Sequence, residues 1–202
     1  MKSTRTDTRR LVTLAIFTAL IIVLQLVANV AKIGPVSITL SLVPIVVGAA
    51  LYGWGSGAYL GGVFGLVVLV CSIAGLDAGG AVLWNSNPFM TALVCLIKGI
   101  AAGACAGLVY RAVGRKNQTA GAICAGITAP VVNTALFVAA MALFFRSDLL
   151  AWTAGWAAET GREANPVYYI ILGLAGVNFL VELAINLILA PIIVRIINAR
   201  KK

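Results

Sequence analysis

Two ionisable residues interrupt long apolar segments of the sequence. Lys98 lies within TALVCLIKGIAAGACAGLVY, residues 91–110, and Glu182 lies within LAGVNFLVELAINLILA, residues 174–190. If both segments are membrane helices, these side chains lie roughly 15–21 Å from the outer helix ends at 1.5 Å per residue. A charge at the centre of a bilayer costs on the order of 2.5–3.5 kcal/mol even on insertion scales. Either Lys98 and Glu182 therefore form a buried structural ion pair, or one or both of them bind a polar ligand.

Uncharged polar residues accompany the two charges in three apolar segments. In the first and the last of these segments, their spacing places them on one face of a helix. They are Thr91, Cys95, Asn133, Thr134, Asn178 and Asn186. Such polar groups do not belong against lipid, so we expect all three helices to turn these faces inward, near the middle of the membrane. Together with adjoining loops rich in Trp and Asn, they predict a small-molecule pocket that opens outward.

The residue types present exclude most catalysis. The sequence has no histidine, which removes the commonest general base and metal ligand, and with it Ser-His and Cys-His nucleophiles. The four cysteines lie in apolar segments without the spacing of a metal site or a disulfide framework. No phosphate-binding loop of the form GxxxxGK followed by Ser or Thr occurs, so the chain does not power transport with its own ATP hydrolysis. The pattern indicates binding without catalysis, with no cofactor and no metal.

The composition places these segments in a lipid bilayer. Of the 202 residues, 61% are hydrophobic and 10% are charged, whereas soluble domains carry about 25% charged residues. The first apolar run, residues 11–31, is long enough to span a bilayer and too long for the core of a signal peptide. Hydropathy and helix-breaking residues predict an all-α integral membrane protein, a single six-helix domain over residues 1–202. The predicted transmembrane helices cover residues 11–31, 37–53, 57–74, 89–112, 119–145 and 167–196.

The net charge of +9 comes mainly from three basic clusters. Eleven of the 15 Lys and Arg residues lie before the first predicted helix, between residues 111 and 116, or at the C-terminus. With six spans, these clusters and both termini fall on one side, which the positive-inside rule assigns to the cytoplasm. This distribution favours a multi-pass protein of the cell membrane, expected to be a bacterial plasma membrane, and argues against a nucleic-acid partner.

Small residues four apart line one face of three predicted helices. Gly61 belongs to such a face in the third helix, and Gly99 belongs to one in the fourth. In lipid these faces let helix backbones approach closely, so internal packing explains them. The similar pair Ala15 and Ala19 in the first helix could instead face another protein.

The predicted outer loops differ in character. Residues 31–41 combine a proline with β-branched residues, which favours an extended stretch before the second helix. Residues 75–89, GLDAGGAVLWNSNPF, and residues 146–169, which contain two tryptophans and two tyrosines, are expected to be loops. An aromatic belt at the membrane interface explains much of the longer loop, and a lid over an external pocket is the alternative.

Six short spans, basic cytoplasmic ends and a ligand pocket resemble the substrate-binding S components of energy-coupling factor (ECF) vitamin transporters. The first helix, LVTLAIFTALI, carries an Ala-x-x-x-Ala pair, Ala15 and Ala19, similar to the pair with which this family docks onto its transmembrane coupling subunit. Residues 33–66 look like the family's first loop and its second and third helices. The segment ITAPVVNTALF is similar to the Asn-Thr segment seen especially in the pantothenate-type branch.

This resemblance implies a high-affinity vitamin-capture subunit. The chain would associate with a transmembrane coupling subunit and two cytoplasmic ATPases, and it would topple in the membrane to release its cargo. The pocket would be lined by the fourth to sixth helices, with the first and third loops as gates. Carried over onto this chain, the substrate-binding candidates are Ser37, Thr39, Trp84, Asn85, Asn87, Thr91, Lys98, Asn133, Thr134, Asn178 and Glu182.

Pantothenate is the first substrate that we expect. Its carboxylate would give Lys98 a reason to be cationic, and its hydroxyl and amide groups would suit the asparagines. Riboflavin or another vitamin of the same family is the alternative within this class. Outside it stand a secondary transporter that couples Lys98 and Glu182 to an ion gradient, and a membrane scaffold without a small-molecule ligand. An intramembrane enzyme is the least expected.

Overall fold

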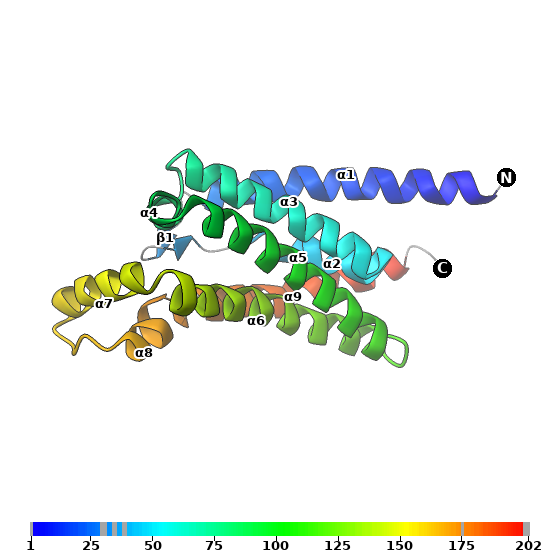
Figure 1. The fold of residues 1–202 in the computed structure, drawn as a ribbon. Coiled ribbons are helices and arrows are strands. Elements are labelled where there is room, and N and C mark those ends of the chain that lie inside the picture. The colour runs from blue at the N-terminus through cyan, green and yellow to red at the C-terminus, as the bar shows by residue number, and fades with distance from the viewer. Residues whose placement is uncertain (1, 29–31, 34–35, 38–39, 175, 200–202) are drawn as a thin grey trace.

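The computed structural model describes residues 2–28, 32–33, 36–37, 40–174 and 176–199, which form a bundle of helices (Figure 1). The long helices are α1 (Lys2–Ala28), α3 (Trp54–Ile73), α5 (Pro88–Val113), α6 (Gln118–Phe144) and α9 (Gly176–Ala199). The short ones are α2 (Leu42–Tyr52), α4 (Ala78–Ser86), α7 (Arg146–Thr160) and α8 (Pro166–Tyr168), the last of which continues into the π-helix η1 (Tyr169–Leu174). Strands β1 (Lys32–Ile33) and β2 (Val36–Ser37) pair antiparallel ahead of α2.

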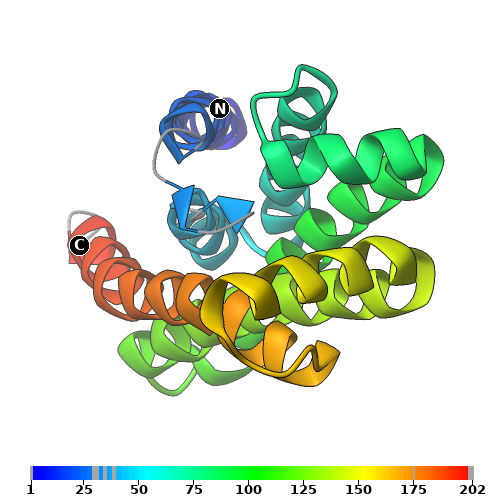
Figure 2. The ribbon, with the colours of Figure 1, turned by 90° about the vertical axis from the view of Figure 1, so that its left-hand side faces the viewer.

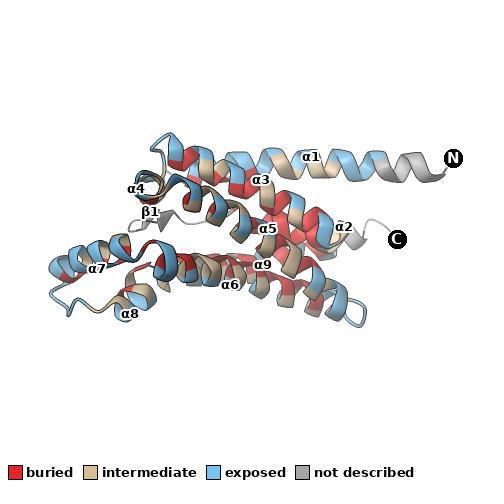
Figure 3. Cartoon of the chain, viewed as in Figure 1, coloured by how far each residue is buried: buried red, intermediate tan, exposed pale blue. Residues whose placement is uncertain are grey.

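Among the residues that the structure describes, five helices are long and apolar enough to cross a membrane. Their spanning segments are Thr8–Ala28, Trp54–Ile73, Pro88–Val113, Gln118–Phe144 and Asn178–Ile196. The outward faces of the bundle are exposed and the faces between helices are buried (Figure 3). The exposed faces carry large apolar side chains, such as Leu11, Phe89 and Leu180, as contact with lipid requires. Apart from the short hairpin, the expected helical membrane fold is therefore confirmed.

The second predicted span, residues 37–53, differs from the structure. α2 begins only at Leu42, because β-branched residues ahead of it favour the extended hairpin over a helix. Its 11 residues rise only about 16 Å, roughly half of the hydrocarbon core. All residues from Leu42 to Ala49 are buried, and Figure 2 shows α2 in the interior, beside α1, α3 and α9. This segment is thus a short core helix and not a lipid-facing one.

Two segments that were expected to be loops are helical. Residues 78–86 form α4, and residues 146–160 form α7, both at the end of the bundle away from the chain termini (Figure 1). The residues typical of turns lie at the ends of these helices. Asp77 and Asn87 flank α4, and Gly161 ends α7 in a left-handed conformation with φ of 66°. Residues of this kind are common at the ends of helices, so their presence does not exclude a helix between them. The prediction of loops from composition was wrong for this reason.

α3 and α5 pack backbone to backbone through their glycines. A Cβ on Gly61 would meet the carbonyl oxygen of Gly99, and a Cβ on Gly99 would meet that of Gly61. The same mutual contact joins Gly57 and Gly103 one turn away. The internal packing expected of these faces is therefore confirmed. This glycine contact between α3 and α5 fixes the position of the part of α5 that carries Lys98.

Replacing Gly61 with alanine is expected to destabilise the protein by roughly 1–2 kcal/mol, because the added methyl group would force α3 away from the backbone of α5. Gly62 is the matched control, since the nearest atom to a Cβ there is Ile100 Cγ1 at 3.5 Å, an ordinary contact. Thermal unfolding of detergent-solubilised Gly61→Ala and Gly62→Ala measures the difference. Equal unfolding temperatures would mean that α3 and α5 can move apart at Gly61 without loss of stability.

A buried cluster holds the short helices against the end of the bundle that lies away from the chain termini (Figure 1). Its members come from α4, α6, α7 and η1 and from the residue between α6 and α7: Leu83, Met141, Phe145, Leu149, Tyr169 and Leu174. Trp156 of α7 adds a ring contact with Tyr169, with centroids 5.9 Å apart. These contacts position α4 and α7 beside the ends of α5 and α6.

Candidate functional site

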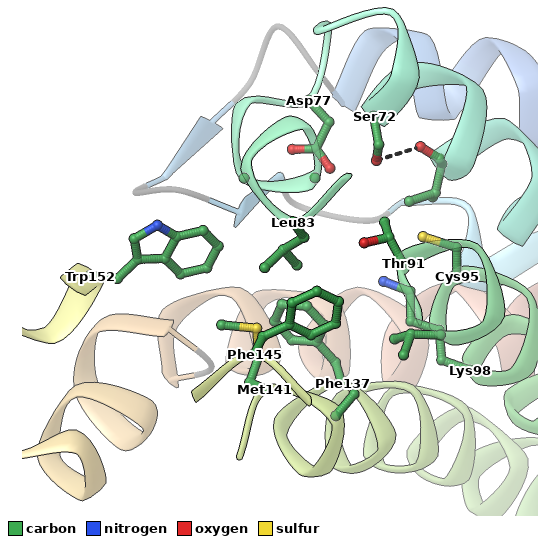
Figure 4. A pocket seen from close by; sticks show the side chains of 15 residues that line it. Ser72, Asp77, Leu83, Thr91, Cys95, Lys98, Phe137, Met141, Phe145 and Trp152 are labelled. Atoms are coloured by element: carbon green, nitrogen blue, oxygen red, sulfur yellow. Dashed lines mark hydrogen bonds between the residues drawn. The ribbon is translucent and has the colours of Figure 1, made fainter. Parts of the chain in front are cut away.

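A cavity lies where α3, α4, α5, α6 and α7 meet (Figure 4). It contains about 460 Å³ of empty space, part of which is open to solvent. Like sites for small ligands, the cavity has mainly apolar walls and a few polar groups. The lining residues are Val68, Ser72, Asp77, Gly79, Gly80, Leu83, Thr91, Val94, Cys95, Lys98, Phe137, Ala140, Met141, Phe145 and Trp152.

Lys98 supplies the cation of this cavity. Its amino group points from α5 into the cavity (Figure 4). The ammonium nitrogen lies 5.1 Å from the centroid of the Phe137 ring on α6, which is a cation–π contact. Such a contact stabilises a desolvated cation by about 2 kcal/mol. The aromatic ring and the opening of the cavity explain how an apolar helix tolerates Lys98, and they leave the ammonium group facing a potential ligand.

Thr91 is the second predicted residue that lines the cavity. It is 2% exposed, and its hydroxyl group donates to the carbonyl oxygen of Asn87 at 2.9 Å. Asn87 itself is the N-cap of α5, and its side-chain oxygen accepts from the backbone N–H of Met90 at 3.1 Å. This cap, with Pro88 in the first turn, defines where α5 begins. It thereby fixes the positions of Thr91 and Lys98 along the wall.

The polar residues of α9 are buried but do not reach this wall. Asn178 is 6% exposed, Glu182 4% and Asn186 0%. Asn186 Nδ2 donates to the backbone carbonyl oxygen of Glu182 at 2.8 Å. The inward orientation expected of this face is confirmed. Among the residues that the structure describes, however, those lining the cavity include Lys98 and none of these three.

Five further candidates with described side chains are not among the residues that line the cavity: Trp84, Asn85, Asn87, Asn133 and Thr134. On α4, Asn85 is exposed, and Leu83 faces the cavity instead. On α6, Asn133 is 7% exposed and lies one turn before Phe137, further from the C-terminal end of the helix. The side chains of Ser37 and Thr39 lie outside the described residues, so the gate expected in the first loop stays a prediction.

Most of the residues that line the cavity were not predicted from the sequence. Phe137 and Met141 of α6, Phe145 just after it and Trp152 of α7 line the cavity. Aromatic and apolar residues in apolar segments carry no signal that separates a ligand site from lipid contact or core packing. Asp77 could have been found, because it is one of only six acidic residues in the chain and immediately precedes a stretch of small and apolar residues.

The thiols and carboxylates offer no metal site in the described part of the chain. No group of three or more Cys, Asp or Glu side chains there could hold a metal ion. Cys71 and Cys95 are buried free thiols, whereas Cys105 and Cys124 are half-buried free thiols.

Ala15 and Ala19 lie on the exposed face of α1. Only 17% of the spanning window of α1 is buried, against 50% for α3. Unlike Gly61 and Gly99, this alanine pair is not buried against another helix of the same chain. It leaves a strip of small side chains on the outer surface of the bundle.

Comparison with known proteins identifies the family. The chain matches the model of the ECF transporter, substrate-specific component, over residues 9–194. It is similar to the pantothenic acid transporter PanT of Lactococcus lactis subsp. cremoris (strain MG1363), with 29% identity over 193 residues that cover 90% of this chain and 89% of the relative. No solved structure matches it significantly. The family match includes the cavity and nearly all of the five long helices. The chain therefore belongs to the substrate-specific components of ECF transporters, and it is a vitamin-binding subunit of a membrane importer and not an enzyme.

Proposed function

We propose that this subunit captures pantothenate in the cavity between α3, α5 and α6, with Lys98 binding the carboxylate. The observation that carries the proposal is the Lys98 ammonium group, which points into a cavity whose walls are mainly apolar. A carboxylate placed there accepts charge-assisted hydrogen bonds in surroundings of low dielectric, where they are stronger than in water. The 29% identity to a protein named as a pantothenic acid transporter supports the same substrate.

The other residues of the cavity wall are suited to contact the amide and the branched apolar carbon of pantothenate. Pantothenate joins its carboxylate through an amide to a branched apolar carbon and two hydroxyl groups. Leu83, Met141 and Phe145 offer apolar contacts to the branched carbon, and Thr91 offers a hydroxyl oxygen to the amide. Riboflavin has no carboxylate and would leave Lys98 without an ionic partner, so it is the weaker alternative.

The distribution of charge supports a cytoplasmic location for one end of the bundle. Both ends of the chain and the connection from α5 to α6, with Arg115 and Lys116, lie at that end (Figure 1). In a cell membrane with this orientation, the cavity lies near the outer face. The proposed topology has six spans, with the hairpin and α2 together as the second, in a single membrane domain.

The proposed partners are a transmembrane coupling subunit and two cytoplasmic ATPases. Ala15 and Ala19 would form the contact with the coupling subunit, because small exposed residues let a second helix approach closely. The chain has no phosphate-binding loop of its own, so ATP hydrolysis that drives transport would take place in such partners.

Mass spectrometry of small molecules that co-purify with the detergent-solubilised chain tests the substrate directly. Equilibrium binding of radiolabelled pantothenate to the same chain in lipid nanodiscs then gives the affinity, with riboflavin as competitor. We expect saturable binding of pantothenate that riboflavin does not displace. Retention of riboflavin or another vitamin instead would contradict the proposed substrate without affecting the family assignment.

Proteoliposomes that contain this chain alone are expected to bind pantothenate but not to accumulate it, with or without a proton gradient. The reason is that, in the proposed function, the partner ATPases supply the energy for transport, and this chain has no phosphate-binding loop of its own. Addition of the coupling subunit, the two ATPases and ATP should give uptake. Accumulation by the isolated chain that an uncoupler abolishes would support an ion-coupled secondary transporter in its place.

A further inference from the structure

Asp77 brings a second charged group to the cavity that Lys98 lines. It precedes α4 at the N-cap position, but its side chain makes no capping hydrogen bond. Its Oδ1 atom is buried and has no hydrogen-bond partner. A buried acceptor left unpaired in this way carries an unrecovered desolvation cost. A ligand that donates a hydrogen bond to Asp77 would remove that cost.

The end of α3 fixes the position of this carboxylate. The Asp77 N–H donates to the carbonyl oxygen of Cys71 at 3.2 Å, and Ser72 Oγ donates to that of Val68 at 2.9 Å. A Cβ on Gly80 would meet Ser72 Oγ and would lie 2.8 Å from Asp77 Oδ2. Because Gly80 has no side chain, the Ser72 hydroxyl and the Asp77 carboxylate can share one corner of the cavity.

This corner and Lys98 have opposite chemical character. The proton of the Ser72 hydroxyl is directed at Val68, so the corner offers hydrogen-bond acceptors and a negative charge. Lys98 offers hydrogen-bond donors and a positive charge. Figure 4 shows Asp77 beside α4 and Lys98 on the wall formed by α5, both facing the cavity. A ligand bound between them is therefore oriented, with its anionic group at Lys98 and a neutral donor at Asp77.

We propose that Asp77 determines the specificity of the cavity for the end of the cargo that lies away from Lys98. It accepts a hydrogen bond from a neutral hydroxyl group and excludes a second anion. This role rests on the proposed function, in which Lys98 binds the carboxylate of pantothenate and the hydroxyl groups lie at the far end. A phosphate on the terminal hydroxyl would bring negative charge against the Asp77 carboxylate, so the phosphorylated vitamin is rejected.

Binding of three ligands to the purified full chain in nanodiscs tests this role. They are pantothenate, pantothenate phosphorylated on its terminal hydroxyl, and an analogue with hydrogen in place of that hydroxyl. The unmodified protein is expected to bind the phosphorylated ligand at least about thirtyfold more weakly than pantothenate, and the deoxy analogue about fivefold more weakly. Asp77→Asn should reduce the ratio between the affinities for pantothenate and for its phosphorylated form by roughly fivefold, because asparagine has no charge and can donate a hydrogen bond to the phosphate. Asp77→Glu, which keeps the charge, should still reject it.

Asp148→Asn is the matched control. Asp148 Oδ1 accepts from Ser86 Oγ at 2.7 Å, and the residue is not among those described as lining the cavity. This variant should leave all three affinities unchanged. Equal binding of pantothenate and its phosphorylated form by the unmodified protein would overturn the role of Asp77, whether or not any variant folds. So would unchanged discrimination in a folded Asp77→Asn. If the unmodified protein binds no pantothenate at all, the proposed function fails, and the role of Asp77 fails with it.

Discussion

Tryptophan in place of Ala15 or Ala19 is expected to abolish vitamin uptake by the assembled transporter and to leave binding by the isolated chain unchanged. Both alanines are exposed on α1, and α1 contributes no described residue to the wall of the cavity. An indole ring at either position would hold a partner helix away from α1 and remove the close backbone approach that small residues permit. Uptake and co-purification of the coupling subunit should both fall by at least about tenfold, which corresponds to 1.4 kcal/mol of association free energy.

Ile16→Trp is the control for this prediction. Ile16 is 59% exposed on the same helix, about 100° around the axis from Ala15 and about 60° from Ala19, and a large side chain is already present there. It should assemble and transport normally. Loss of uptake in all three variants would point to faulty insertion of α1. Normal uptake in both alanine variants would mean that the partner approaches through another face.

The long helices could be predicted because lipid requires about 20 apolar residues for each span. α3, α5 and α6 begin and end within three residues of the predicted ranges. The nature of α2 could not be predicted in the same way. Its residues are as apolar as those of a spanning helix, but protein surrounds them in place of lipid, and hydropathy does not distinguish the two environments.

Helix α7 shows the limit of composition as a guide to structure. α7 was expected to be part of a loop because hydropathy and helix-breaking residues predict no span between residues 145 and 167. Its interior is nevertheless rich in Ala and Leu, and a left-handed Gly161 ends it. The Trp156 side chain of α7 packs against Tyr169 of η1. A contact between two different elements cannot be read from the local sequence of either one.

The sequence predicted those residues of the candidate site that are polar side chains in an apolar helix, because such side chains cannot face lipid. Lys98 and Thr91 line the cavity, and both are polar residues in an apolar helix. The same signal marks Asn133 and Glu182, which are buried but absent from the described wall. A polar residue inside a membrane protein has to avoid lipid, and any protein neighbour can satisfy that need. The cation–π partner Phe137 gave no signal at all, because its role follows from its distance to Lys98.

Replacing Lys98 with methionine is expected to weaken pantothenate binding by at least tenfold, or about 1.4 kcal/mol. Removing one partner of a buried, hydrogen-bonded charge pair commonly costs about 2–5 kcal/mol, which would extend the loss to about thirtyfold or more. Methionine keeps a long apolar stem, and its sulfur can still contact the Phe137 ring, so the wall should stay packed. Titration calorimetry in nanodiscs measures the affinity, and thermal unfolding of the same samples verifies the fold.

The loss in Lys98→Met should depend on the charge of the ligand. Pantothenol, in which an alcohol replaces the carboxylate, should bind weakly to the unmodified protein and about equally to Lys98→Met, because it has no anion for Lys98 to bind. Comparing the two ligands and the two proteins forms a double-mutant cycle, whose coupling energy isolates the ammonium–carboxylate interaction from any general effect on the cavity. A coupling energy near zero in a folded variant that binds pantothenate normally would leave Lys98 with a structural role only. The carboxylate would then have to bind elsewhere, and the orientation of the cargo between Lys98 and Asp77 would lose its basis.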